Sequence, residues 1–237
     1  MNYLISGASG GIGKAILKEL YNTNDNFIVL YNSKKNFIKK KNITSYKSNF
    51  KKLKEVKSLI TVILNKFSKI DVFINCAGNA NPYKEAFNIS DDEFENSLRI
   101  NFKSPLIVMT TIIKNQIKKK LKLNIINISS NTIKYGGSKY NLHYLCSKVA
   151  LENACKNLSK NFIDRNIKIN IIRPGVIHTN MHKKIKGYTA KDFKKRISKI
   201  PLKKSGTSKD ISKTVKFIIS KDSNYIHGQI FTVAGGE

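Results

Sequence analysis

The sequence predicts an α/β fold in which helices cover both faces of one doubly wound parallel sheet. Three observations carry this prediction. Apolar runs of strand length alternate with longer segments of helical spacing, a glycine-rich turn follows the first run, and 41% of the 237 residues are hydrophobic, enough to bury a full core. No repeat or low-complexity linker divides the chain, so we expect residues 1–237 to form a single domain.

The first half of the chain alternates in this way from its first residues. Residues 3–6 predict a buried strand, and residues 14–20 predict an amphipathic helix. The apolar runs at 27–31 and 72–74 predict further strands, with another strand and helix between them. Parallel pairing is expected because helical crossovers join these strands.

The second half continues the alternation with longer helices. We expect long helices at about 91–119 and 143–162, with a strand ending at Ser130 between them. A strand at 169–172, a variable segment, a helix and a final strand complete the order. The expected sheet therefore has ligand-binding loops at the carboxyl ends of its strands.

The turn after the first strand reads S-G-A-S-G-G-I-G at residues 6–13. Glycines permit a tight turn and a close approach of the backbone to a pyrophosphate. The helix that follows would direct its free N–H groups and its dipole at the phosphates. We therefore predict a dinucleotide site whose first contacts are Gly7, Ser9, Gly11, Ile12 and Gly13.

Tyr144 and Lys148 are spaced i and i+4 on the helix expected at 143–162. This spacing places the phenol and the ammonium on one helix face. A free tyrosine has a pKa of ~10 and is a poor acid–base catalyst at neutral pH. A neighbouring cation is expected to lower the pKa of the phenol, so the pair predicts proton transfer.

Seven ordered motifs, which span nearly the whole chain, resemble the short-chain dehydrogenase/reductase family, and within it the 3-oxoacyl-(acyl-carrier-protein) reductases. The motifs are S-G-A-S-G-G-I-G at 6–13, Asp71 leading into N-C-A-G at 75–78, R-I-N-F at 99–102, I-S-S at 128–130, Y-L-C-S-K at 144–148, R-P-G-V-I-H-T at 173–179 and the closing F-I-I-S to V-A-G-G at 217–236. The resemblance implies a Rossmann fold and an oxidoreductase that uses a nicotinamide dinucleotide.

By this resemblance, Asn101, Ser130, Tyr144 and Lys148 match the family's catalytic tetrad. Ser130 would hydrogen-bond the substrate carbonyl, and Tyr144 would protonate its oxygen. Lys148 would lower the pKa of the tyrosine and bond the nicotinamide ribose, while Asn101 would hold a water that resupplies protons. Ser129 is the alternative for the serine role, although successive strand residues point to opposite faces; we favour Ser130.

Further cofactor contacts follow from the resemblance and from positions at strand ends. They are Asn49, Asn75, Ala77, Gly78, Pro174, Gly175, Ile177 and Thr179, together with Tyr144 and Lys148. Asn75 has a second interpretation, as a hydrogen-bonding residue at the sheet end. Asn49 stands where the family usually has an adenine-contacting Asp, so its contact is chemically altered.

The residues after the second strand indicate the choice of dinucleotide. An acid there would bond the ribose 2′-OH and repel a 2′-phosphate. Residues 32–35 read Asn-Ser-Lys-Lys, with no acid. NADPH is therefore favoured, with Ser33 and Lys34 as the 2′-phosphate contacts. NADH stays the alternative, because Gly10 stands where many NADPH-dependent members carry a basic residue.

The formal net charge is +29, from 44 basic and 15 acidic residues. Specific nucleic-acid recognition relies on Arg, and only four of the basic residues are Arg, so scattered Lys indicates codon bias rather than a nucleic-acid partner. A basic surface also suits an acidic acyl carrier protein. The resemblance makes Arg165 a docking position, and Lys119 and Lys120 lie in the other implicated region.

The resemblance also implies that the segment at about 183–204 covers the substrate, with Met181, Ile185, Tyr188 and Phe193 as lining residues. The leading function is NADPH-dependent reduction of a 3-oxoacyl thioester in fatty-acid synthesis. The alternatives are a reductase of another carbonyl or alcohol, such as a sugar or surface-polymer precursor, and a non-catalytic dinucleotide sensor.

The resemblance further implies a homotetramer built through the two long helices, and we expect the protein to be cytoplasmic. No membrane association and no metal site are expected, and the three cysteines are expected to be reduced and buried.

Overall fold

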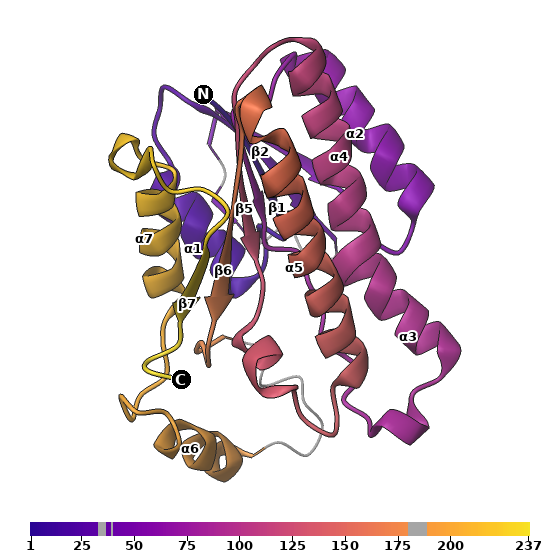
Figure 1. The fold of residues 1–237 in the computed structure, drawn as a ribbon, viewed down its shortest axis with the longest axis vertical. Coiled ribbons are helices and arrows are strands. Elements are labelled where there is room, and N and C mark those ends of the chain that lie inside the picture. The colour runs from indigo at the N-terminus through magenta and orange to yellow at the C-terminus, as the bar shows by residue number, and fades with distance from the viewer. Residues whose placement is uncertain (33–36, 39, 180–188) are drawn as a thin grey trace.

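The computed structural model describes residues 1–32, 37–38, 40–179 and 189–237 (Figure 1). Its described strands form one seven-stranded sheet in the order β3-β2-β1-β4-β5-β6-β7, and every neighbouring pair is parallel. The strands are β1 (Asn2–Ser6), β2 (Asn26–Tyr31), β3 (Ile43–Lys47), β4 (Val72–Asn75), β5 (Leu123–Ile128), β6 (Ile167–Pro174) and β7 (Ile230–Val233). The predicted doubly wound parallel sheet is confirmed.

Helices cover both faces of this sheet, and those in the described part of the chain are α1 (Gly11–Leu20), α2 (Leu53–Phe67), α3 (Asp91–Leu98), α4 (Ser104–Lys118), α5 (Leu142–Phe162), α6 (Ala190–Ser198) and α7 (Ser208–Ile218). Figure 1 shows α1 and α7 on one face and α2, α4 and α5 on the other, with α6 beyond the carboxyl end of the sheet. Within the described residues, no helix has the length and apolar character that crossing a bilayer requires.

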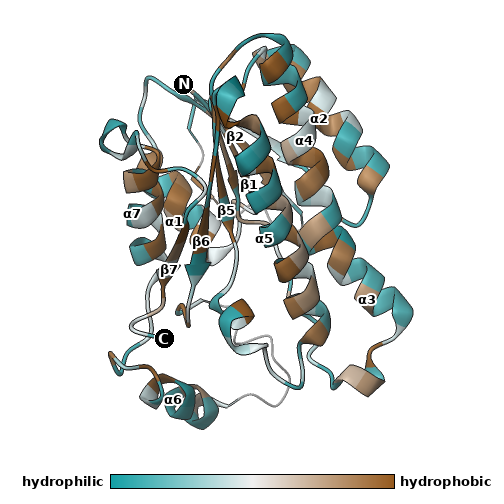
Figure 2. Ribbon diagram, viewed as in Figure 1, coloured by the Kyte–Doolittle hydropathy of each residue, from teal (hydrophilic) through white to brown (hydrophobic). Residues whose placement is uncertain are grey.

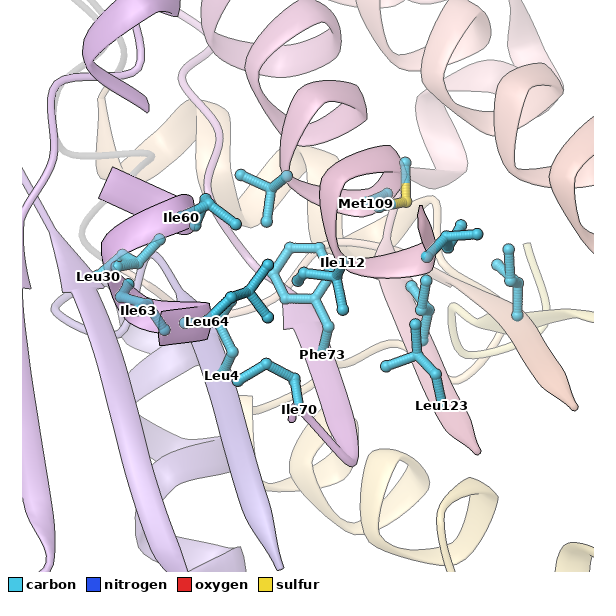
Figure 3. Packing of buried hydrophobic residues seen from close by; sticks show 14 of the residues in the cluster. Leu4, Leu30, Ile60, Ile63, Leu64, Ile70, Phe73, Met109, Ile112 and Leu123 are labelled. Carbon is cyan, nitrogen blue, oxygen red and sulfur yellow. The ribbon is translucent and has the colours of Figure 1, made fainter. Parts of the chain in front are cut away.

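Two apolar clusters hold these layers together. One lies between the sheet and the α2, α4 and α5 layer, where Phe73 of β4 packs with Ile60 and Ile112 (Figure 3). The other lies under α1 and α7, where Ile16 and Val215 are fully buried. The strands are correspondingly apolar along most of their length (Figure 2). Burial on both faces explains why the strands read as continuous apolar runs rather than as alternating patterns.

The strand order reverses next to β1. The chain runs outward from β1 to β2 and β3, and then returns to place β4 on the other side of β1. At the carboxyl end of β1, Ser6 is in register with Leu30 of β2 and Asn75 of β4. Open α/β sheets bind ligands at such a reversal, so the fold places the predicted dinucleotide site there.

The long helix predicted at about 91–119 is not one regular α-helix. A π-helical turn, Arg99–Lys103, separates α3 from α4 and contains the buried Asn101. Pro105 lies at the start of α4 and has no N–H to donate to the carbonyl of Asn101, four residues earlier. The proline therefore interrupts the α-helical ladder at this point, and the N–H of Ser104 donates instead to Arg99, five residues back.

Candidate active site

The glycine-rich turn packs too tightly for side chains at two of its positions. Gly7 has a φ of +68°, and a Cβ there would lie 2.7 Å from the carbonyl oxygen of Cys76. A Cβ on Gly13 would press against the backbone of Gly7, 2.9 Å from its carbonyl carbon. The backbone of this turn thus lies directly against the loop that follows β4, a packing that only glycine at position 7 allows.

The amino end of α1 is suited to an anion. Gly10 caps this helix without any side-chain hydrogen bond, and no acidic residue lies in the first turn. The N–H groups of that turn are therefore not engaged by a capping side chain. A Cβ on Gly11 would lie 2.9 Å from Cγ2 of Thr179, so this glycine lets the chain that follows β6 pack against the start of α1. These features fit a nucleotide pyrophosphate.

The structure brings together predicted cofactor residues from separate loops. A Cβ on Gly78 would lie 3.3 Å from both Asn101 Oδ1 and Lys148 Nζ, so the loop after β4 reaches the proposed catalytic residues. The remaining described residues of the predicted set are Ser9, Ile12, Asn49, Ala77, Pro174, Gly175 and Ile177, of which Pro174 and Ile177 are buried. Ile177 forms an isolated bridge with Gly206, which fixes the chain beyond β6.

The side chain of Asn75 hydrogen-bonds residues of the two neighbouring strands. Its Oδ1 accepts a hydrogen bond from Ser6 Oγ at 2.7 Å, and its Nδ2 donates to Asn127 Oδ1 at 2.8 Å. All three side chains are fully buried. The second interpretation of Asn75, as a hydrogen-bonding residue at the sheet end, therefore describes its side chain. Asn49 makes a local turn, since its Oδ1 accepts from the N–H of Lys51 at 3.1 Å.

Several predicted residues lie outside the described residues. These are the predicted 2′-phosphate contacts Ser33 and Lys34 and three of the predicted substrate-lining residues, Met181, Ile185 and Tyr188. Phe193 is described on α6, where its ring packs edge-on against His178 with 5.8 Å between the ring centroids.

Tyr144, Ser130 and Lys148 converge where β5 meets the first turns of α5. The hydroxyl of Ser130 lies beside the side chain of Tyr144 and acts to lower its pKa. Lys148 Nζ lies 5.7 Å from the centroid of the Tyr144 ring and donates to the carbonyl of Ile128 at 3.0 Å. Tyr144 and Lys148 are both buried, while Ser130 is half-buried. This arrangement can hold a carbonyl oxygen between two hydroxyl groups.

Burial, rather than the neighbouring cation, dominates the titration of this pair. It raises the pKa of Tyr144 to about 12, against a smaller lowering by the hydrogen bond with Ser130. Burial also lowers the pKa of Lys148 to about 8. The expected net lowering of the tyrosine pKa is therefore wrong for this geometry, because burial outweighs any lowering by Lys148. Tyr144 is protonated at neutral pH, which is the form that a proton donor needs.

Asn101 is fully buried, and its amide holds the loop after β4. Its Oδ1 accepts from the N–H of Asn79 at 2.8 Å, and its Nδ2 donates to the carbonyl of Asn79 at 2.9 Å and to Ser97 Oγ at 3.1 Å. The side chain therefore fixes the backbone next to Gly78, and thus next to Lys148.

The two serines at the end of β5 have different partners. Ser129 is buried and donates a hydrogen bond to Glu152 Oε2 at 3.0 Å. Ser130, and not Ser129, acts on the pKa of Tyr144. The opposite facing of successive strand residues accounts for this division, and the geometry favours Ser130 for the substrate.

Sequence reasoning missed the polar cluster around Glu152. This carboxylate binds Arg173 through two hydrogen bonds, one of them 2.9 Å from Nε to Oε2. A signal was present, because Glu152 follows Lys148 by four residues and so extends the helix face that carries Tyr144 and Lys148. An acidic residue on a buried helix face needs a partner, but spacing alone does not identify Arg173.

We predict that Gly13→Ala is destabilising and weakens dinucleotide binding, whereas Gly10→Ala changes little. The new Cβ at position 13 meets the backbone of Gly7, and such overpacking costs about 2 kcal/mol. At position 10 the backbone is extended and the nearest atom is 3.3 Å away. Thermal melts and fluorescence titrations with NADPH check both variants. Equal effects at the two positions would contradict the tight-turn argument.

Sequence comparison finds relatives that match this chain over nearly its full length. A family model described as enoyl-(acyl carrier protein) reductase matches residues 7–237. The chain is 32% identical to the 3-oxoacyl-[acyl-carrier-protein] reductase FabG of Buchnera aphidicola subsp. Baizongia pistaciae, covering 98% of this chain and 95% of that protein. It is 31% identical to the FabG protein of Rickettsia conorii, with the same coverage.

Solved structures are similar over nearly the full length. A 4-hydroxyisoleucine dehydrogenase mutant complexed with NADH and succinate has a TM-score of 0.91 at 26% identity, over 100% of this chain and 98% of that one. A tyrosine-to-phenylalanine variant of ElxO with NADPH bound has a TM-score of 0.86 at 26% identity, over 99% and 97% of the two chains. Both a phosphorylated and an unphosphorylated nicotinamide dinucleotide thus occur among similar structures.

Proposed function

The chain belongs to the short-chain dehydrogenase/reductase family, and we propose that it is an NADPH-dependent 3-oxoacyl-(acyl-carrier-protein) reductase. One observation carries the catalytic part of this proposal: the Ser130 hydroxyl and the buried ammonium of Lys148 both lie beside Tyr144. Membership of this family makes the protein an oxidoreductase that uses NAD or NADP. The substrate and the preferred dinucleotide are the proposed parts.

In the proposed reaction, Ser130 and Tyr144 both donate hydrogen bonds to the ketone oxygen of the substrate. The bound dinucleotide supplies the hydride that adds to the carbonyl carbon. Tyr144 transfers its phenolic proton to the oxygen, so the ketone becomes a secondary alcohol and the phenol becomes a phenolate. The ammonium of Lys148, 5.7 Å from the ring centroid, stabilises this negative charge as it forms.

Lys148 has a second proposed role, at the nicotinamide ribose. Its Nζ lies beside Gly78, in the loop that Asn101 fixes through Asn79. We propose that Gly78 leaves room for the ribose next to Lys148, since a Cβ there would lie 3.3 Å from Nζ. Asn101 then acts by holding this loop. The predicted water at Asn101 stays a proposal for the resupply of protons.

The choice of NADPH rests on residues 32–35, Asn-Ser-Lys-Lys, which lack the acid that favours NADH. Ser33 and Lys34 are the proposed 2′-phosphate contacts. Titrations with NADPH and NADH should give a lower Kd for NADPH, and Lys34→Ala should reduce the difference. A lower Kd for NADH would overturn the assignment.

The proposed substrate follows from the curated relatives, which are named as reductases of acyl chains carried on acyl carrier protein. The net charge of +29 supports an acidic carrier as partner, because opposite charge speeds encounter. Arg165 is a proposed docking residue. Its side chain is 61% exposed and pairs with the neighbouring Asp164. We also propose a cytoplasmic homotetramer, and light scattering that gives a monomer would contradict the assembly.

The test is the initial rate of NADPH oxidation with acetoacetyl-acyl carrier protein, compared with the coenzyme A ester of the same acid. Rapid oxidation that favours the carrier-linked substrate is expected, and Tyr144→Phe should lower its rate at least about 100-fold. A small secondary alcohol such as 4-hydroxyisoleucine, assayed with NAD and NADP, is the competing substrate, because 4-hydroxyisoleucine dehydrogenase is a similar structure. Faster turnover of that alcohol would replace the proposed substrate.

A further inference from the structure

A buried carboxylate joins the three elements that carry the proposed active site. Glu152 lies near the middle of α5 and is 1% exposed. It accepts hydrogen bonds from Ser129 at the end of β5 and from Arg173 near the end of β6, and Lys156 Nζ lies 3.6 Å from its Oε1. One side chain therefore ties α5 to the carboxyl ends of two neighbouring strands.

Each of these three elements carries a proposed active-site residue or loop close to the contacts of Glu152. On α5, Lys148 and Tyr144 precede Glu152 by four and eight residues, which places all three on one helix face. On β5, Ser129 is followed directly by Ser130, the partner of Tyr144. On β6, Arg173 is followed by Pro174 and the loop that leads to Thr179. A shift of α5 along the strands would therefore separate Tyr144 from Ser130.

We propose that Glu152 is a positioning residue that sets the register of Tyr144 and Lys148 against Ser130 and the loop after β6. The inference rests on the proposed function of these residues and adds a role for Glu152, Ser129 and Arg173. Glu152 acts through Ser129 and Arg173, and it has no proposed contact with substrate or dinucleotide.

The charge of Glu152 is fixed over the working pH range. Burial acts to raise its pKa, but the hydrogen bonds from Arg173 and Ser129, together with the charge of Arg173, outweigh it and lower the pKa. The carboxylate is therefore ionised at neutral pH and keeps its hydrogen bonds with Ser129 and Arg173. Removal of Arg173 would leave this anion buried without its main partner, whereas Arg173, whose side chain is 18% exposed, can turn toward water if Glu152 is neutralised.

The test therefore neutralises Glu152 and, in a separate variant, removes the hydrogen bond that Ser129 donates to it. In Glu152→Gln the shape is kept and the charge is lost, and Ser129→Ala leaves the ion pair with Arg173 in place. The matched control is Glu95→Gln, because Glu95 also binds two cations, Arg99 and Lys103, but on the partly exposed helix α3. All variants are assayed with the substrate that the wild type turns over, at a temperature where circular dichroism shows them folded.

We expect Glu152→Gln to lower kcat on the order of 10-fold to 100-fold, because small misplacements of reacting groups have effects of this size. Here kcat is the rate divided by the concentration of sites that bind the nucleotide. The Kd for NADPH should rise by a smaller factor than kcat falls, since the contacts of the glycine-rich turn are kept. Ser129→Ala should give a smaller loss of kcat, and adding it to Glu152→Gln should cause little further loss, since both act through one tie. Glu95→Gln should leave kcat unchanged.

Two results would overturn the inference. The first is a lower melting temperature for Glu152→Gln with an unchanged kcat, which would make the cluster structural only. The second is a full additional loss when Ser129→Ala is combined with Glu152→Gln, which would mean that Ser129 acts on the substrate itself. A wild-type protein that turns over no carbonyl or alcohol with either dinucleotide would instead refute the proposed function, so the two failures are distinguishable.

Discussion

Tyr144→Phe is expected to lower kcat for carbonyl reduction on the order of 100-fold to 10,000-fold, the range that a positioned general acid contributes. The change removes one hydroxyl from a buried ring and leaves the apolar packing in place. Ser130 can still hydrogen-bond the ketone oxygen, but no group then supplies its proton. The measurement is kcat by single-wavelength NADPH oxidation, with the Kd for NADPH from fluorescence titration.

Nucleotide affinity separates a loss of proton transfer from a loss of structure. The glycine-rich turn follows β1 and Tyr144 lies on α5, so the substitution leaves the turn unchanged. The Kd for NADPH should therefore stay within about 3-fold of the wild type. Tyr225→Phe is the matched control, since Tyr225 loses the same hydroxyl from a fully exposed ring. A fall in nucleotide affinity as large as the fall in kcat would rule out the proton-donor role of Tyr144.

The local chemistry of the site was predictable where it depends on short spacings. The glycines at 7 and 13 identified the tight turn because few other residues fit so close to a neighbouring backbone. The i, i+4 spacing of Tyr144 and Lys148 identified their shared helix face. The continuous apolar strands identified a sheet covered on both faces, and the structure confirms that sheet.

Features that depend on contacts between distant segments were not predictable in this way. The π-helical turn at Arg99–Lys103 lies directly before α4, whose first turn holds Pro105, and helical periodicity alone does not reveal it. The pairing of Glu152 with Arg173 joins residues that are 21 positions apart. The pKa of Tyr144 was predicted with the wrong sign, because the spacing shows the cation but not the burial that outweighs it.

Lys148→Met is expected to remove turnover and at the same time to stabilise the fold at neutral pH. Without the ammonium, the phenolate formed by proton transfer lies buried with no counter-charge, and kcat should fall on the order of 100-fold to 1,000-fold. Retention of kcat within 3-fold would refute this role of Lys148.

The gain in stability has a defined pH window. Burial lowers the pKa of Lys148 from 10.5 to about 8. Below pH 8 the amine is protonated in both the folded and the unfolded chain, so folding bears the full cost of burying the charge. Between pH 8 and 10.5 only the unfolded chain holds the proton, and the stability of the wild type therefore rises with pH relative to that of the methionine variant.

The size of the gain follows from the same shift. A change from 10.5 to about 8 corresponds to about 3 kcal/mol, and loss of the hydrogen bond to the Ile128 carbonyl offsets about 1 kcal/mol. Urea unfolding at pH 7 should thus show the variant more stable by about 2 kcal/mol, and the advantage should close as the pH rises from 8 to 10.5. A variant less stable than the wild type at pH 7 would mean that the surrounding carbonyls and sulfur atoms solvate the ammonium better than burial alone allows. In that case Lys148 would hold its proton well above pH 8.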